Sequence, residues 1–182
     1  DVSGYGYTTL KTLSGFNSLT CFENLQNTSI TYNGSNMVVT ATGNDPQTNW
    51  KTVGSIATDA VKAIKIVFKN NSGAASTGQL FYKDGTGTFN ETDSFYWPVG
   101  ATTSTQTVWI DTVNHIAYNQ TTGEFSTVKG SGWTGNITGM RFDWTTASSG
   151  SVEVSEISFI GNGSASGTGG YQNTQTLVHS AG

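Results

Sequence analysis

The chain has 182 residues and a mass of 19.2 kDa, enough for one well-buried domain and short for two. Glycine, threonine, serine and asparagine supply 88 of these residues and charged residues only 11%, which excludes a helical bundle and favours strands and turns. The net charge is −4 and the basic residues are scattered, so no nucleic-acid partner is expected. No apolar run approaches the roughly 20 residues that span a bilayer, so membrane insertion is not expected either.

Residues 1–21 show no clear alternation of apolar and polar side chains, and they form either a leader strand or an N-terminal arm. From residue 22 onward, short apolar runs are separated by turn sequences such as Asn33-Gly34. The runs predict nine strands, at 29–32, 36–41, 49–53, 63–69, 79–83, 94–99, 106–111, 137–143 and 151–160. We therefore predict an all-β antiparallel β-sandwich of jelly-roll type over 22–160, followed by a Gly/Ser-rich linker or tail over 161–182.

Alternation within the predicted strands indicates which side chains face the core. Inward positions fall to Ile64, Ile66, Phe68, Leu80, Tyr82, Phe95, Trp97, Val108, Ile110, Met140 and Phe142. Outward positions fall to aromatic and planar polar side chains, namely Gln79, Phe81, Tyr96, Trp109, Arg141 and Asp143. Trp109 is thus predicted to be an exposed indole. Trp50 and Trp144 lie at strand ends, a position that is compatible either with the rim of a binding site or with the core. Trp133 is expected to pack in the core or against a loop.

Residues that carry covalent or acid–base chemistry form no strong motif. His115 and His179 fall in irregular segments, and the single cysteine, Cys21, is expected to be a small buried thiol. Zinc-ligand spacing and phosphate-binding loops are absent from the sequence. Two carboxylates across a cleft could serve a glycosidase, but a pair such as Glu91 and Asp93 in a Gly/Thr loop is expected to be solvated. We therefore expect no enzymatic activity.

The outward aromatic side chains suit a carbohydrate ligand. The apolar face of a pyranose stacks on an aromatic ring while neighbouring amides, guanidinium and carboxylate groups bind its hydroxyls. We predict that Trp109, Tyr96 and Phe81 stack on a glycan. Gln79, Arg141 and Asp143 would orient that glycan, with Trp50 and Trp144 at the rim of the site. Trp109→Ala is expected to weaken glycan binding while leaving the thermal midpoint nearly unchanged.

The order of several segments resembles the galactose-binding-like β-sandwich domains that bacteria append to secreted polysaccharide-degrading enzymes, a carbohydrate-binding-module type. The resemblance covers about 140 residues. It is carried by Phe22-Glu23 and by residues 38–47, 64–71, 78–82, 132–143 and 152–157.

This resemblance implies a noncatalytic, extracellular module, part of a larger multidomain enzyme, that holds the enzyme on a polysaccharide. It also implies a structural calcium ion between the first and last strands, with Glu23 and Glu156 as ligands and with Ser155 where the family usually has Asp. Two alternatives remain open. One is a structural or adhesive cell-surface sandwich whose aromatic residues are all in the core, and the other is a glycoside-active domain.

Overall fold

The structure is a computed structural model that describes residues 6–14, 16, 21–127, 130 and 132–162. Within these ranges the regular secondary structure is entirely β, with fifteen strands. Accordingly, no helix that could cross a membrane is found in this part of the chain. All strand pairs are antiparallel.

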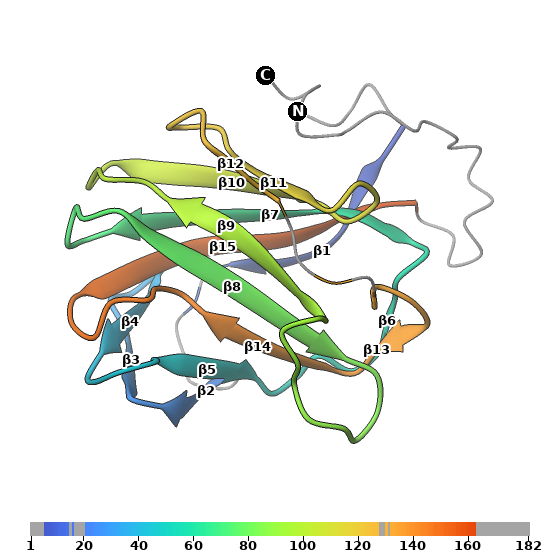
Figure 1. The fold of residues 1–182 in the computed structure, drawn as a ribbon, viewed down its shortest axis with the longest axis horizontal. Coiled ribbons are helices and arrows are strands. Elements are labelled where there is room, and N and C mark those ends of the chain that lie inside the picture. The colour runs from blue at the N-terminus through green and yellow to red at the C-terminus, as the bar shows by residue number, and fades with distance from the viewer. Residues whose placement is uncertain (1–5, 15, 17–20, 128–129, 131, 163–182) are drawn as a thin grey trace.

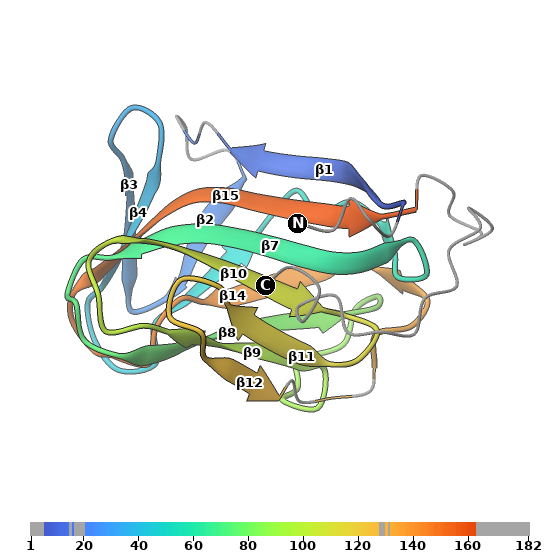
Figure 2. The same cartoon turned by 90° about the horizontal axis from the view of Figure 1, so that it is seen from above.

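Two sheets form the sandwich (Figure 1). The eight-stranded sheet has the order β12-β11-β10-β7-β15-β4-β3, and β1 pairs with the other part of β15 (Figure 2). Its strands are β1 (Thr8–Ser14), β3 (Thr28–Tyr32), β4 (Met37–Ala41), β7 (Val61–Asn70), β10 (Thr105–Asp111), β11 (Ile116–Asn119), β12 (Phe125–Thr127) and β15 (Ser151–Gly161).

The five-stranded sheet has the order β2-β5-β14-β8-β9 and lies in front of the larger sheet in Figure 1. Its strands are β2 (Phe22–Gln26), β5 (Gln47–Trp50), β8 (Ser76–Lys83), β9 (Ser94–Val99) and β14 (Gly139–Asp143). A separate short pair, β6 (Ile56–Ala57) and β13 (Asn136–Ile137), lies at one end of the sandwich.

The predicted fold class is confirmed, and eight of the nine predicted strands exist with bounds that differ by a few residues. The ninth, 137–143, divides into the end of β13 and the whole of β14, which lie in separate sheets. The sequence pattern missed β2, β6, β11 and β12, which are two to five residues long and too short to show a clear alternation of apolar and polar side chains. Residues 8–14 form β1 against β15, so the sandwich begins before residue 22. The linker expected over 161–182 falls, from residue 163, outside the described residues.

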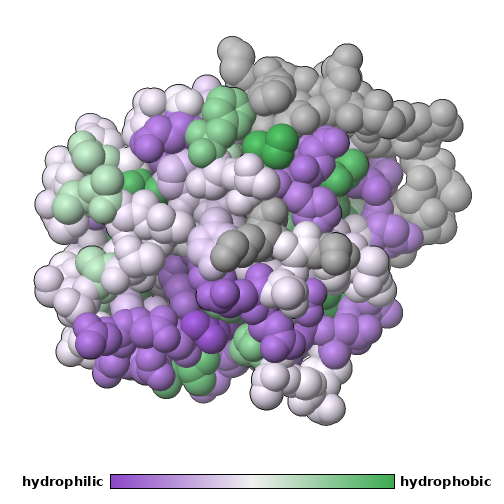
Figure 3. All heavy atoms as spheres, viewed as in Figure 1, coloured by the Kyte–Doolittle hydropathy of each residue, from purple (hydrophilic) through white to green (hydrophobic). Residues whose placement is uncertain are grey.

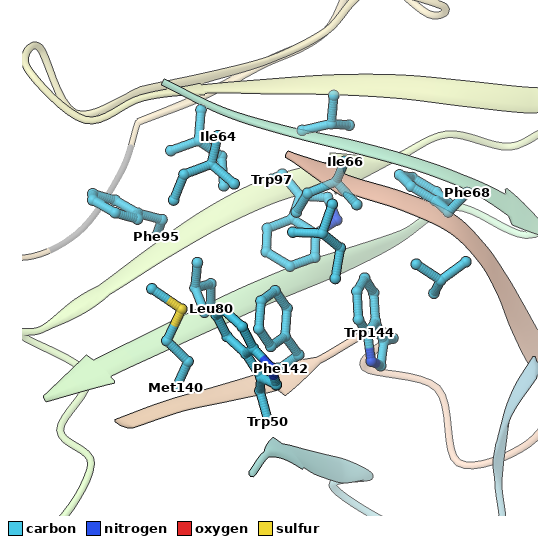
Figure 4. Close-up of a cluster of buried hydrophobic side chains, with 14 of the residues drawn as sticks. Trp50, Ile64, Ile66, Phe68, Leu80, Phe95, Trp97, Met140, Phe142 and Trp144 are labelled. Atoms are coloured by element: carbon cyan, nitrogen blue, oxygen red, sulfur yellow. The ribbon is translucent and has the colours of Figure 1, made fainter. Parts of the chain in front are cut away.

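One hydrophobic cluster joins the inner faces of the two sheets (Figure 4). All eleven side chains predicted to point inward belong to it. Gly78, directly opposite Trp97 on β9, makes room for the indole, because a Cβ atom there would lie 2.0 Å from Trp97 Cε2. Trp97 is fully buried as expected, and Trp133 packs against the cluster from its edge.

Trp50 and Trp144 are also in this core, so their predicted place at a binding rim is wrong. They are only 1% and 2% exposed. Trp50 stacks on Phe159 of the opposite sheet at 5.6 Å between ring centroids. Trp144 stacks on Phe142 at 5.0 Å, and its Nε1 donates a hydrogen bond to Thr48 Oγ1 (3.0 Å). Both indoles simply continue the inward alternation of β5 and β14, since Asn49 and Asp143, one position earlier, point outward.

Candidate functional site

Five of the six predicted outward residues share the outer face of the five-stranded sheet. Strand register places Arg141 opposite Phe81 on β8, and Asp143 opposite Gln79, which in turn lies opposite Tyr96 on β9. The row continues across the sheet from Arg141 to Asn49 on β5 and Glu23 on β2. Figure 3 shows hydrophilic side chains gathered on the lower part of this face, over β2, β5 and β14.

Arg141 and Asp143 form a two-pronged ion pair at the centre of this face. The guanidinium donates from Nε to Asp143 Oδ1 (2.8 Å) and from Nη2 to Oδ2 (2.7 Å). This geometry locks both planar groups, because the parallel hydrogen bonds fix their relative orientation. Burial raises the pKa of the Asp143 carboxyl; the hydrogen bonds and charge of Arg141 act against this shift, and the charge of Asp45 adds to it.

Phe81 lies beneath this ion pair and is not a free stacking surface. The guanidinium carbon of Arg141 lies 4.1 Å from the Phe81 ring centroid, and Phe89 approaches the ring edge-on at 6.5 Å. Phe81 is therefore only 4% exposed. Its predicted direction was correct and its predicted accessibility was wrong, since alternation along a strand does not show what covers a side chain. In this position Phe81 supports the guanidinium of Arg141.

A cavity of about 300 Å³ opens beside the ion pair. Tyr96 is its only aromatic side chain among the described residues, and the others are polar: Asn44, Asp45, Thr77, Gln79, Asp143, Thr145 and Thr146. The amide of Gln79 is oriented by donation from Nε2 to Ser94 Oγ (2.9 Å), and this hydroxyl donates to the carbonyl of Glu91 (2.8 Å). The cavity thus combines one part-exposed aromatic ring with hydrogen-bonding groups held in fixed positions.

Sequence reasoning missed the remaining polar residues of this cavity, of which Thr77 lies in β8 and the others in loops. Thr77, in β8, has the same parity as Gln79, and extending the predicted strand by two residues would have found it. Asp45 lies in the turn between β4 and β5, and its φ of 54° places it in the left-handed region. Its carboxylate accepts a hydrogen bond from Gln47 Nε2 (2.9 Å) and lies 3.9 Å from Arg141 Nη2. That approach depends on tertiary packing, so no local pattern signals it.

Trp109 lies on the other side of the sandwich, on the outer face of the eight-stranded sheet. Its predicted direction away from the core is correct, but the predicted exposed indole is wrong, because Trp109 is only 7% exposed. It forms a small second cluster with Tyr7, Ala63 and Ile160. The indole Nε1 donates to Gln120 Oε1 (2.7 Å), and Lys65 Nζ lies 5.6 Å from the ring centroid. Trp109 cannot share a ligand with Tyr96 on the opposite face.

The structure does not support Glu23 and Glu156 as ligands of one calcium ion. Glu23 lies on the outer face of the five-stranded sheet, where it accepts a hydrogen bond from Asn49 Nδ2 (2.9 Å). Glu156 lies on the opposite outer face, 3.3 Å from Lys65 Nζ, and accepts from Ser158 Oγ (2.7 Å). The neighbouring hydroxyl of Ser155 donates to the carbonyl of Val67. Nowhere in the described ranges do three or more His, Cys, Asp or Glu side chains gather as metal ligands.

Cys21, predicted to be buried, is half-buried against the edge of the core and forms no disulfide. Burial raises the pKa of its thiol above the ordinary value. A thiol with a raised pKa is a poor nucleophile at neutral pH, which agrees with the packing role expected of it.

The fold is similar to that of several solved structures. A family 11 carbohydrate-binding module from Clostridium thermocellum, in complex with a β-1,3-1,4-mixed-linked tetrasaccharide, matches with a TM-score of 0.52 and 17% identity over 84% of this chain and 95% of that one. A xylan-binding domain from family 22 matches with a TM-score of 0.51 and 13% identity, over 86% and 96%. A carbohydrate esterase from the Shiga toxin-encoding bacteriophage phi24B matches with a TM-score of 0.50 and 12% identity, over 86% and 100%.

Comparison of the sequence with models of protein families and with curated proteins gives no match. The structural similarities establish the class of fold: a β-sandwich of the type that carbohydrate-binding modules share.

Proposed function

We propose that this chain is a noncatalytic carbohydrate-binding module that binds a polysaccharide on the outer face of the five-stranded sheet. The observation that carries the proposal is the cavity beside Tyr96. One part-exposed aromatic ring there is surrounded by oriented amide, carboxylate and hydroxyl groups. This is the combination that a sugar ring requires, because a pyranose has an apolar face and a rim of hydroxyls that both donate and accept hydrogen bonds.

Each group has a distinct part in this binding mode. Tyr96 offers its ring to the apolar face of one sugar unit. Gln79 and the oxygen atoms of Asp143 accept hydrogen bonds from hydroxyls, and Arg141 holds Asp143 in place through two hydrogen bonds. Because these groups are positioned before a ligand arrives, little conformational entropy is lost on binding.

The ligands named for the structural neighbours support a choice of polysaccharide. One neighbour is described in complex with a mixed-linked tetrasaccharide and another as a xylan-binding domain. We propose neutral β-linked glucans and xylans as the first ligand class to test. In the cellular context, we propose that the module is secreted and holds a polysaccharide-degrading enzyme on its substrate.

The test is retention of the chain on insoluble xylan, on cellulose and in gels containing mixed-linked β-glucan. We expect retention on at least one of these, and loss of retention for Tyr96→Ala. Tyr118→Ala is the matched control, because Tyr118 is a part-buried tyrosine on the opposite outer face, stacked on Phe125 at 4.5 Å. Equal retention of both variants would contradict the proposed site, and release of reducing sugars by the chain would contradict a noncatalytic role.

A further inference from the structure

The β3 edge of the eight-stranded sheet is open. β3 pairs with β4 on one side and is the last strand of the sheet on the other. Figure 2 shows the β3–β4 hairpin at the upper left, with β3 on its outer side. No described strand pairs with the outer side of β3, so its outward backbone groups are available to another strand.

Hydrogen bonds at the two ends of the β3–β4 hairpin show which residues of β3 point their backbone groups outward. Asn33 N donates to the carbonyl of Asn36 (3.2 Å) at the turn. At the other end, Thr42 N donates to the carbonyl of Asn27 (2.9 Å). Residues of an antiparallel pair alternate between bonding to the partner strand and facing away from it, so the odd-numbered residues of β3 bond to β4. The even-numbered residues, which face the open edge, are Thr28, Ile30 and Tyr32.

This edge is regular and its turn is fixed. The register between β3 and β4 runs without a shift from Thr28 to Tyr32. Glu153, on β15, accepts hydrogen bonds from the side-chain amides of Asn33 (2.7 Å) and Asn36 (3.3 Å) at the hairpin turn. A strand held in this way loses little conformational entropy when a second strand pairs with it.

The other edge strands in the described ranges carry features that hinder pairing with a further strand. β1 and β2 are each interrupted by a register shift, and they carry Lys11 and Glu23. β9 contains Pro98, β12 has three residues, and β6 and β13 have two each. Bulges, charges, proline and short length are the means by which proteins protect sheet edges. β3, with the sequence Thr-Ser-Ile-Thr-Tyr, has none of these features.

The sequence of β3 is complementary to a second copy of itself in an antiparallel pairing centred on Ile30. In that register Ile30 lies opposite Ile30 of the second copy, and Thr28 lies opposite Tyr32. These are the residues whose backbone groups face outward, so the pairing makes three hydrogen-bonded pairs with about six hydrogen bonds. On the outer face Ser29 lies opposite Thr31, and hydroxyl side chains pair favourably across strands. No charged side chain of β3 opposes the second copy.

We propose that the open edge of β3 is an interaction surface for a second copy of this chain. The two β3 strands pair antiparallel about a twofold axis, which joins two eight-stranded sheets into one continuous sheet. If the proposed function holds, such a dimer carries two sheet-face sites and gains avidity for a polysaccharide. The dimer goes beyond the proposed function, and its formation does not depend on glycan binding.

The first test is sedimentation equilibrium of the full chain. We expect a monomer–dimer equilibrium with a dissociation constant of about 100 µM, because an interface of two short strands is small. Amide hydrogen exchange by NMR then tests which groups pair. Exchange at Thr28, Ile30 and Tyr32 should slow several-fold as the concentration rises through that constant. Exchange at Ser29 and Thr31 should stay unchanged, since their amides already bond to β4.

Paired substitutions on the outer face test the register. Ser29→Lys with Thr31→Lys changes two exposed side chains and sets like charges opposite each other in the dimer, so the dissociation constant should rise about tenfold. Ser29→Lys with Thr31→Glu sets opposite charges there and should keep or strengthen the dimer. Thr105→Lys with Thr127→Lys is the matched control. It makes the same charge change at exposed positions on β10 and β12, away from β3, and should leave the dimer unchanged.

Three outcomes would overturn the dimer. They are a chain that stays monomeric up to about 1 mM, tenfold above the expected constant, a dimer that Ser29→Lys with Thr31→Lys leaves intact, and equal exchange behaviour of the odd and even amides of β3. Retention on polysaccharide is measured separately. A chain that dimerises but is retained on no polysaccharide would contradict the proposed function and still support the β3 interface.

Discussion

The two outer faces of the sandwich carry aromatic side chains at comparable positions in their strands, but the two faces differ in how far these side chains are exposed. On the five-stranded sheet, Tyr96 stays part-exposed in a polar cavity. On the eight-stranded sheet, one row of paired residues runs from Lys65 through Trp109 and Tyr118 to Phe125. In that row the indole of Trp109 is covered by Tyr7 and Ile160, and only Phe125, at 49%, is well exposed.

The difference between the faces comes from what lies next to each sheet. β1 pairs with β15 at one side of the larger sheet, and Tyr7, just before β1, packs on Trp109. On the smaller sheet, the loop before β5 contributes only Asn44 and Asp45, which are polar and line a cavity. The same outward alternation therefore gives a second small core on one face and an accessible site on the other.

The largest effect that tests this comparison is expected from Trp109→Ala. We expect it to lower the free energy of unfolding by about 3 kcal/mol, as for other buried Trp→Ala changes, because it empties the second cluster. Retention on polysaccharide should remain. Chemical denaturation and the retention assay measure the two effects. A variant that is as stable as the native chain but no longer binds would instead support the sequence-based prediction that Trp109 is an exposed indole that stacks on the glycan.

The next largest effect is expected from Tyr96→Ala compared with Tyr118→Ala. Loss of the stacking ring in the cavity should weaken glycan binding about tenfold, or roughly 1.4 kcal/mol, whereas the tyrosine on the other face should not affect it. Isothermal titration calorimetry with a xylan or mixed-linked oligosaccharide gives both affinities. A similar loss in the two variants would mean that the faces do not differ in function.

A smaller effect is expected from Arg141→Lys. Lysine keeps the charge but cannot make the two parallel hydrogen bonds to Asp143 or lie flat on Phe81. We expect a loss of about 1 kcal/mol in unfolding free energy, the size of one net hydrogen bond, and a loss of affinity of about threefold. Thermal denaturation and calorimetry check these values. Unchanged affinity would show that the ion pair does not orient the ligand.

The smallest effect is expected from the pH dependence set by Asp143. Its raised pKa means that protonation begins above the ordinary carboxyl value of about 3.9, and a protonated carboxyl loses its ionic pairing with Arg141. Glycan affinity should therefore fall by a few-fold as the pH is lowered through that raised pKa. Asp143→Asn should bind more weakly at neutral pH and show a flatter profile.

Protonation of Asp143 is expected to affect folding and binding in opposite directions. It weakens glycan binding, whereas it favours the folded state. Because the folded-state pKa lies above the unfolded one, the group favours the folded state most below the unfolded pKa. This contribution declines as the pH rises through the folded pKa. Unfolding free energies measured from about pH 4 upward should show this decline in the native chain and lose it in Asp143→Asn. An identical slope in both proteins would assign the pH dependence to other groups.

Much of the fold could be predicted because apolar alternation is a local property of each strand. The two-residue period alone was enough to predict which side chains face the core in β7 and β8, namely Ile64, Ile66, Phe68, Leu80 and Tyr82. The strands that were missed, such as β11 and β12, are only four and three residues long and are defined by pairing with neighbouring strands, which the sequence does not show.

The candidate site was predicted in part for the same reason. Alternation placed Gln79, Tyr96, Arg141 and Asp143 on one side of their strands, and sheet order then brought them together. It could not show that Arg141 covers Phe81, that the loop residue Asp45 reaches Arg141, or that Glu23 and Glu156 lie on opposite faces.

The sequence by itself therefore determined an antiparallel β-sandwich, many of its core residues and the direction of the side chains in the strands with clear alternation, because these follow from composition and from a two-residue period. The tertiary structure alone decided which outward aromatic is buried and which is accessible. It also decided which carboxylates reach Arg141, and where the cavity beside Tyr96 opens. Those features depend on contacts between segments far apart in the chain, and strand periodicity carries no information about such contacts.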